Sequence, residues 1–383
     1  MPATYDPVAP PDLTLPPSTN TVSVSIIDTT SSITGLPTSR FFVPEVSGAK
    51  YFVDVRAFSF LIQHPRLNRH LLFDLGIRKD IENVPFINNL KSSSAEVKVE
   101  KGVREVLEEG GFDATRLEAV IWSHWHFDHT GNPSTFEPHT AVIVGPGFKN
   151  KVAPGYPANP DAHFLESDYT GRELREIDFS PGAGVTSIGQ FRALDYFGDG
   201  SFYLLDTPGH AVGHLCGLAR VTSNPDSFIF MGGDACHHPG EFRPSKYLPF
   251  PPNISPNPFT SFTAPTAPCP GSLFEGLLRD GDPTRSFYDL SPSGVHYNVE
   301  EAEKTIAKIQ GADCRDNILV AVAHDSTLPS VVDFFPKTAN EFVEKGWVKK
   351  LRWLFLRDFA KAVGYDGEVE GISADWAKWN GTG

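Results

Sequence analysis

Three histidines and one aspartate are concentrated in a single short run, Ser123-His124-Trp125-His126-Phe127-Asp128-His129. The run follows an apolar stretch, residues 117–122, whose composition predicts a β-strand. In an extended segment His124, His126 and Asp128 would point to one side, and a turn at His129 would bring that ring to the same cavity. Imidazole nitrogen suits zinc, iron or manganese, and carboxylate oxygen adds a harder ligand. The run therefore predicts a metal site with ligands for two adjacent ions rather than a loose His-rich tract.

Further predicted strands each end in a side chain that is able to bind a metal. Residues 201–206 lead into Thr207-Pro208-Gly209-His210, residues 228–233 lead to Asp234, and residues 318–323 lead to His324. Upstream, residues 71–73 lead into Asp74. We expect the side chains at these strand ends to converge after folding.

The HxHxDH string and the order of the residues that follow it resemble the metallo-β-lactamase superfamily. The resemblance spans residues from about 20 to 330 and implies an α/β fold, a four-layer αββα sandwich with metals at one edge of the two sheets. It implies that Asp74 supports the ligand loop from behind rather than binding metal. By the same mapping the metal ligands are His124, His126 and His210 for one ion and Asp128, His129 and His324 for the other, with Asp234 bridging them.

Such a ligand set implies two divalent ions, with zinc favoured and iron, manganese or cobalt also suitable. The superfamily's chemistry is the hydrolysis of an activated or cyclic carbonyl compound, in which a pair of ions ionises water and polarises the carbonyl oxygen. We predict that Asp128 takes part in proton transfer. His237 and His238 follow Asp234, and the resembling acyl-homoserine lactonases have a tyrosine at the place of His237, so His237 is a second catalytic candidate. The alternative is that His237 or His238 only anchors the segment that follows.

Length and composition favour one domain with additions. The 383 residues are 40% hydrophobic, enough for a large core. We expect an extended, proline-rich arm at residues 1–19, one domain over residues 20–383, insertions at about 149–172 and 237–295, and a C-terminal extension. The aromatic second insertion suggests a wall or lid over an apolar pocket; a surface insertion or a dimer contact is the alternative. The aromatic residues after His324 are expected to pack in the core.

Charge and cysteine content limit the partners. The formal net charge of −14 argues against a nucleic-acid substrate. No apolar run of about 18 residues predicts a membrane span, and four cysteines without metal-finger spacing favour a reducing cytoplasm. Cys236 lies two residues after Asp234 and is expected to be a small buried residue. His214 is expected to have a structural role, and an oligomer is left open.

Local patterns predict several further elements. Strands are expected at residues 21–27, 51–63, 70–73 and 141–144, and helices at residues 95–109, 299–310 and 338–345.

A lipophilic lactone, as in acyl-homoserine lactones, is the first substrate hypothesis. A lactam or an aromatic polyketide thioester is the alternative. The non-enzymatic alternative is a ligand-binding protein that retains the metals, which would be expected to have lost a ligand position.

Overall fold

The centre of the molecule consists of two six-stranded sheets. The computed structural model describes residues 5–52, 54–92, 95–182, 184–260, 267–369 and 380. In the first sheet, β1, β6 and β7 are antiparallel neighbours, whereas β7, β9, β10 and β11 run parallel. Its strands, in spatial order, are β1 (Ser23–Ile27), β6 (Ser59–His64), β7 (Arg69–Phe73), β9 (Ala119–Ile121), β10 (Ala141–Val144) and β11 (Leu174–Glu176).

The second sheet is antiparallel except for its last pair, β16 and β20. As a result β14, β16 and β20 all run in the same direction, and their carboxyl ends lie at one edge of the sheet. Its strands, in spatial order, are β12 (Val185–Ile188), β13 (Phe191–Asp195), β14 (Phe202–Asp206), β15 (Leu215–Thr222), β16 (Ser227–Met231) and β20 (Ile318–Ala321).

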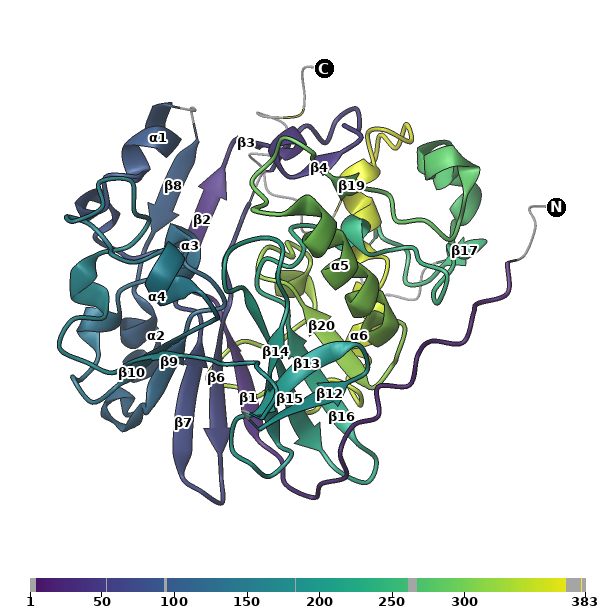
Figure 1. The fold of residues 1–383 in the computed structure, drawn as a ribbon. Coiled ribbons are helices and arrows are strands. Elements are labelled where there is room, and N and C mark those ends of the chain that lie inside the picture. The colour runs from purple at the N-terminus through teal and green to yellow at the C-terminus, as the bar shows by residue number, and fades with distance from the viewer. Residues whose placement is uncertain are drawn as a thin grey trace.

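The two sheets pack face to face and helices cover their outer faces (Figure 1). Phe60 and Phe73 of the first sheet share one buried cluster with Phe202 and Ile229 of the second. On the outer face of the first sheet, helix α2 (Val103–Glu109) packs its Leu107 into a cluster with β7 and β9. On the other side, α5 (Val299–Asp313) packs against β16 and β20. Each sheet thus buries both faces, which confirms the expected αββα sandwich.

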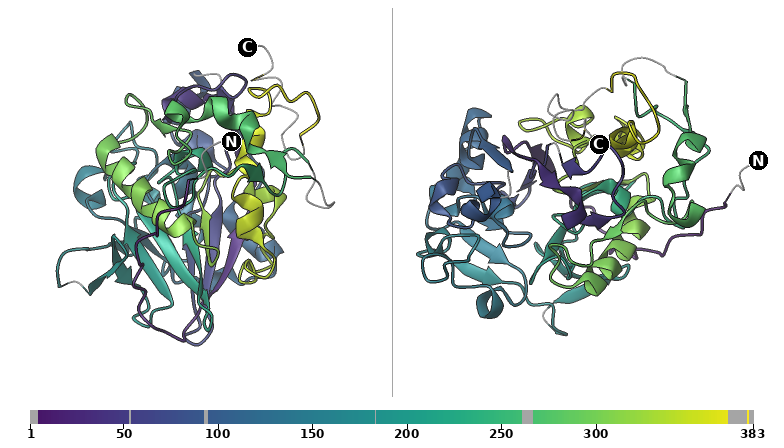
Figure 2. Two further views of the ribbon diagram at one scale, coloured as in Figure 1. Left: turned by 90° about the vertical axis from the view of Figure 1, so that its right-hand side faces the viewer. Right: turned by 90° about the horizontal axis from the view of Figure 1, so that it is seen from above.

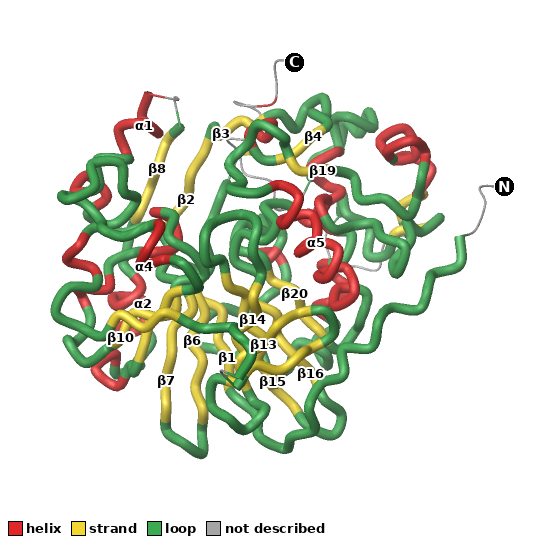
Figure 3. The backbone as a smooth tube through the Cα atoms, viewed as in Figure 1, coloured by secondary structure: helices red, strands yellow, loops and turns green. Residues whose placement is uncertain are grey.

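Smaller elements surround the sandwich, and Figure 3 shows the strands of the two six-stranded sheets in the lower half of the view, with the short strand pairs, loops and helices above them. The remaining helices are α1 (Ile87–Ser92), α3 (Phe127–Thr130), α4 (Phe148–Lys151) and α6 (Trp347–Leu351). The remaining strands form two-stranded pairs: β2 (Ser31–Thr34) with β8 (Glu96–Val99), β3 (Leu36–Pro37) with β5 (Tyr51–Phe52), β4 (Phe42–Val43) with β19 (Asp289–Leu290), and β17 (Asn253–Ile254) with β18 (Cys269–Pro270).

The helix predicted over residues 95–109 is wrong in its first half. Residues Glu96–Val99 form β8, which pairs antiparallel with β2, and the helix starts only at Val103. Glu96 and Lys98 are exposed in alternation with the less exposed Val97 and Val99, which is the period of a strand. The pairing partner β2 is distant in sequence. The contact with β2 therefore determined that these residues form a strand rather than a helix.

Two other predicted elements also differ. Residues 338–345 form turns rather than a helix, because the backbone there bonds to β1: Ala339 N donates to Val24 O over 2.7 Å, and Val24 N donates to the side chain of Asn340. The strand expected over residues 51–63 is divided into β5 and β6. The predicted helix 299–310 lies within α5, and the predicted strand 141–144 is β10.

The aromatic residues of the second insertion pack with the C-terminal extension. Phe287 lies with its ring centroid 5.2 Å from that of Phe359, and Phe250 lies 5.4 Å from Trp353. Together with their neighbours they form a separate hydrophobic cluster, which confirms the core role expected for the C-terminal aromatics. Phe262, also in this insertion, lies outside the described residues.

The N-terminal arm runs along the outside of the molecule, as Figure 2 shows from two further sides. Residues 5–22 contain no helix or strand. Leu13 nevertheless is buried in the cluster that covers the second sheet. Two arginines hold the arm by its carbonyl groups: Arg315 donates to Pro11 O and Arg220 to Pro16 O, each over 2.6 Å.

Candidate metal centre

The HxHxDH run continues from β9 into a loop and then into α3. The sequence had suggested an extended segment as far as Asp128, and this was wrong. The first turn of α3 carries both Asp128 and His129. Backbone hydrogen bonds fix this turn from behind, since Leu75 N donates to His129 O over 2.8 Å and the indole of Trp122 donates to Thr130 O over 3.1 Å. The side chains of Asp128 and His129 consequently start from a turn that backbone and side-chain hydrogen bonds hold in place.

Asp74 lies behind this turn, at the end of β7. It is buried and adopts a φ of 61°, a conformation that aspartate tolerates better than most residues. One carboxylate oxygen accepts a hydrogen bond from Ser123 N over 2.6 Å, and the other lies 2.8 Å from His129 Nδ1. Asp74 thus orients the His129 ring with its Nε2 toward the centre, in the supporting position that the sequence predicted for it.

His210 follows β14 in a turn that packs tightly against α5. A Cβ atom on Gly209, whose φ is 133°, would lie only 2.1 Å from Ala302 N, so glycine is required there. Thr305 Oγ1 donates to Pro208 O over 2.8 Å and holds the same turn. His214 lies deeper: its Nδ1 faces Thr207 O at 3.1 Å and its Nε2 accepts from Asp234 N over 3.0 Å. His214 therefore positions Asp234 through its backbone.

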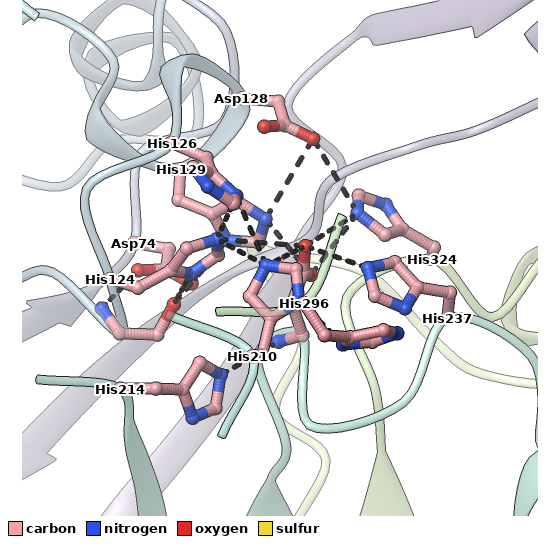
Figure 4. Close-up of polar contacts among 12 residues, drawn as sticks. Asp74, His124, His126, Asp128, His129, His210, His214, His237, His296 and His324 are labelled. Atoms are coloured by element: carbon pink, nitrogen blue, oxygen red, sulfur yellow. Dashed lines mark hydrogen bonds and ion pairs between the residues drawn. The ribbon is translucent and has the colours of Figure 1, made fainter. Parts of the chain in front are cut away.

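The first ligand group, as we call the candidate metal ligands His124, His126, His210 and Asp234, brings together three imidazoles that follow strands of the two sheets (Figure 4). His126 Nδ1 lies 2.9 Å from His124 Nε2 and 3.0 Å from His210 Nε2, and the last two atoms are 3.2 Å apart. Asp234 Oδ2 lies 3.6 Å from His124 Nε2 and 3.5 Å from His210 Nε2. Four donor atoms therefore enclose one point.

The second group lies on the other side of Asp234. Asp234 Oδ1 is 3.0 Å from His129 Nε2 and 3.1 Å from His324 Nε2, while Asp128 Oδ2 is 3.8 Å and 3.5 Å from the same two nitrogens. The Nδ1 atom of His324 is 2.6 Å from Arg56 O, so its Nε2 points to the centre, where it lies within 3.3 Å of both oxygens of Asp234. Asp234 thus lies between the two groups, with Oδ1 nearest His129 and His324 and Oδ2 also within reach of His124 and His210, as a bridging carboxylate would.

These distances fit a pair of divalent ions. Donor atoms at 2.0–2.1 Å around a tetrahedral ion are separated by about 3.3 Å, close to the spacing within each group. Among the described residues, His129 Nε2 and Asp234 Oδ1 are buried and form no hydrogen bond, although they are 3.0 Å apart. Two buried polar atoms that converge without bonding each other fit a shared third atom.

The charge state of the groups agrees with this reading. Burial, together with the neighbouring imidazoles, lowers the pKa of His124, His126 and His210 well below the usual range, so these rings are neutral and carry lone pairs. Burial opposes ionisation of Asp234, but the surrounding His129 and His324 hold the pKa of its carboxyl well below the usual value. The first group therefore combines neutral imidazoles with an ionised carboxylate, whereas at His129 and His324 the effect of burial is outweighed by Asp234, which raises the pKa of both rings.

His237 lies beside the centre and His238 points away from it. His237 Nε2 is 3.4 Å from Asp234 Oδ2, and among the described residues neither ring nitrogen of His237 has a hydrogen-bond partner. His238 instead accepts from Gly240 N and lies 3.1 Å from the Asp358 carboxylate, so it anchors the second insertion. Cys236 is fully buried, and burial raises the pKa of its thiol well above the usual range.

Two histidines outside the motifs also contact the centre. The ring of His163, from the first insertion, lies 5.1 Å from that of His126 and 3.6 Å from that of Phe86. His296, just before α5, has its Nδ1 3.4 Å from His210 Nδ1. His296 belongs to none of the sequence motifs; its only signal in the sequence is a polar ring next to the start of a predicted helix.

Comparisons with known proteins agree with this architecture. Residues 55–222 match the model of the metallo-beta-lactamase superfamily. A gamma-lactamase of Fusarium pseudograminearum is 45% identical to this chain, and the match covers 94% of this chain and 89% of the relative. A metallo-hydrolase of Annulohypoxylon moriforme is 42% identical, and that match covers 97% of this chain and 96% of the relative. A solved N-acyl homoserine lactone hydrolase with a product at its catalytic metal centre has the same fold, with 16% identity, a TM-score of 0.53 and coverage of 83% of this chain and 99% of its own. Within the described part of the chain, no helix is both long and apolar enough to cross a membrane.

Proposed function

Because the chain belongs to the metallo-beta-lactamase superfamily of hydrolases, we propose that it holds two divalent metal ions and opens a cyclic amide or ester. The observation that carries this proposal is the convergence of two donor groups on the carboxylate of Asp234. His124, His126 and His210 would hold one ion, and Asp128, His129 and His324 the other. When bound, such a pair ionises water near neutral pH and polarises a carbonyl oxygen.

Asp128 is the residue best placed to move a proton. Asp128 is less buried than Asp234, the other acid in the centre: 11% of the Asp128 side chain is exposed, against 4% for Asp234. Its Oδ2 lies at the contact distances to His129 and His324 given above, which leaves the other oxygen able to take a proton from water. The same oxygen would return that proton to the nitrogen or oxygen that leaves the opened ring.

His237 is the second catalytic candidate. Burial lowers the pKa of His237, against the opposing effect of Asp234, so the ring is neutral near pH 7. A neutral imidazole has one N–H, and neither nitrogen is engaged by another described side chain in a hydrogen bond. His237 would donate that N–H to the substrate carbonyl or to the leaving atom. The packing of its ring against Phe41, with centroids 4.8 Å apart, fixes its orientation.

A lactam is the substrate class best supported among the alternatives, because the relative named a gamma-lactamase is 45% identical over nearly the whole chain. A lactone stays the second candidate. It is supported by the His126-Phe127-Asp128-His129 string and by the neutral His237 at the place where the resembling lactonases have tyrosine. The rings of Phe41 and Trp125, which pack against His237 and His126, suit a small lipophilic compound.

A substrate panel on metal-analysed protein tests the proposal. Purified protein should contain two divalent ions per chain by elemental analysis. It should open an aromatic γ-lactam faster than a long-chain homoserine lactone or an acyl thioester, and removal of the metals by chelation should abolish turnover. Activity that survives in metal-free protein would refute the metal-dependent mechanism. Preference for the lactone or the thioester would refute only the choice of substrate.

A further inference from the structure

We infer that His296 is a positioning residue that fixes the tautomer and orientation of His210. The inference rests on the proposed role of His210 as a metal ligand and assigns a function to a histidine that lies outside every motif of the chain. It concerns the side of His210 that faces away from the other ligands, where His296 comes between His210 and the loop of Phe41.

The hydrogen-bond chain has a direction. His296 Nε2 lies 3.4 Å from Phe41 O, and a carbonyl oxygen only accepts, so Nε2 carries the hydrogen. In a neutral ring this leaves Nδ1 of His296 as an acceptor. That atom is 3.4 Å from Nδ1 of His210, which must then carry a hydrogen. His210 Nε2 consequently keeps its lone pair, aimed at the first ligand group.

Backbone contacts on both sides hold His296 in this place. Tyr297 N donates to His210 O and Asn298 N donates to Gly209 O, each over 2.8 Å, so the chain after His296 is bonded directly to the turn that carries His210. Before it, Ser291 N donates to Phe41 O over 2.9 Å and Val295 N donates to Arg40 O over 3.2 Å. The His296 ring therefore lies between the turn of His210 and the loop of Phe41. Backbone hydrogen bonds join the segment of His296 to both of them.

The other Nε2-directed ligands have an equivalent partner. Nδ1 of His129 faces the Asp74 carboxylate at 2.8 Å, Nδ1 of His324 faces Arg56 O at 2.6 Å, and Nδ1 of His124 faces Ser123 Oγ at 3.0 Å. Metal-bound histidines generally donate their second N–H to such a group, which raises their basicity and fixes the ring. For His210 the structure assigns this task to His296.

A direct ligand role for His296 is the competing explanation, since ring nitrogens of His210, His237 and His296 lie within 4.8 Å of one another. An ion among these three rings would need the Nδ1 lone pair of His210. A neutral imidazole has only one such lone pair, and in His210 it belongs to Nε2, which lies within 3.2 Å of two other ligand nitrogens. The hydrogen-bonding role therefore agrees with the geometry and the ligand role does not.

Two substitutions separate these roles. His296→Leu removes the acceptor, whereas His296→Asn places an oxygen close to the position of Nδ1. We expect His296→Leu to bind one zinc ion about 10- to 100-fold more weakly in chelator competition. It should also change the visible spectrum of the cobalt-substituted protein, while the thermal midpoint of the metal-free protein stays as in the wild type. His296→Asn should restore most of the affinity and the spectrum. His163→Leu is the matched control, because His163 packs on His126 without hydrogen bonding to it.

The outcomes distinguish the inference from the proposed function. Wild-type protein that binds no zinc would overturn both. Wild-type protein with two zinc ions, together with a His296→Leu variant of unchanged affinity and spectrum, would overturn the positioning role alone. Loss of one whole ion in His296→Leu and in His296→Asn, with the affinity for the remaining ions unchanged, would identify His296 as a ligand and also overturn it.

Discussion

Asp74 and His129 form a buried pair in which the carboxylate of Asp74 lies 2.8 Å from Nδ1 of His129, on the side of the ring opposite the proposed ions. The pair joins the end of β7 to the first turn of α3, so one contact links the frame of the first sheet to the ligand loop. Because the second oxygen of Asp74 also accepts from Ser123 N, the loop is held at both ends.

Asp74→Asn should therefore weaken metal binding without unfolding the protein. Asparagine also tolerates the positive φ at this position, but it removes the negative charge that supports the basicity of His129. We expect zinc affinity to fall about 10- to 100-fold in chelator competition. The matched control is Asp199→Asn, which alters another aspartate–histidine pair, His64 with Asp199 at 2.7 Å, that contains no proposed ligand. Equal losses in both variants would contradict the prediction.

Asp234→Asn should lower the metal content and remove activity. A neutral amide cannot balance two cations as the bridging carboxylate does, and the loss of several kcal/mol of stabilisation corresponds to a fall of about 10³-fold or more in turnover. Elemental analysis should find fewer than two ions per chain. Asp206→Asn serves as control, since Asp206 is also buried at a strand end but pairs with Arg192. A variant that keeps both ions and full turnover would disprove the bridging role.

His237→Phe should separate catalysis from metal binding. The ring volume and the contact with Phe41 are largely retained, but the N–H is lost, so we expect turnover to fall about 10²- to 10⁴-fold with two ions per chain still present. His237→Tyr should recover part of the rate, because a phenol also donates a hydrogen bond. If His237→Phe keeps full activity, His237 has only a packing role.

Asp168 should make stability depend on pH in a direction unusual for an aspartate. Arg78 donates hydrogen bonds to both Asp80 and Asp168. Burial raises the pKa of Asp168 to about 6 against the effect of Arg78. Burial also raises the pKa of Asp80, but there the hydrogen bonds from Arg78 and Asn83 outweigh it and lower the pKa to about 2. The folded protein thus holds the Asp168 proton more tightly than the unfolded chain, so this contribution to stability is complete below pH 4 and is lost as the pH rises through 6.

Urea unfolding of the wild type and of Asp168→Asn measures this effect. The free energy of unfolding of the wild type relative to the variant should fall by about 2 kcal/mol between pH 4 and pH 7, since one pKa unit corresponds to about 1.4 kcal/mol. A difference that stays constant, or that rises with pH, would show that the Arg78 pair dominates over burial.

The convergence of the proposed ligands could be predicted from the sequence because most of them follow an apolar strand in a short local motif. His210 and Asp234 could be recognised without knowing the sheet order, since the motif and the strand lie next to each other in the chain. His296 could not, because its relation to His210 depends on backbone contacts between segments 86 residues apart. The strand Glu96–Val99 was missed for the same reason, because its partner β2 is distant in the chain. The core role of the C-terminal aromatics was predicted, but not their partners in the second insertion, such as Phe287 against Phe359.

The arm ahead of β1 has a practical consequence for anyone who shortens this protein. A version trimmed to residue 20 would lose Leu13 from a filled apolar surface and would remove the carbonyl of Pro16 from the fully buried guanidinium of Arg220. A buried donor left without its acceptor costs about 1–3 kcal/mol, in addition to the exposed hydrocarbon. Poor yield from such a trimmed protein would therefore reflect the loss of the contacts that the N-terminal arm makes. It would not show that the αββα sandwich begins before residue 20.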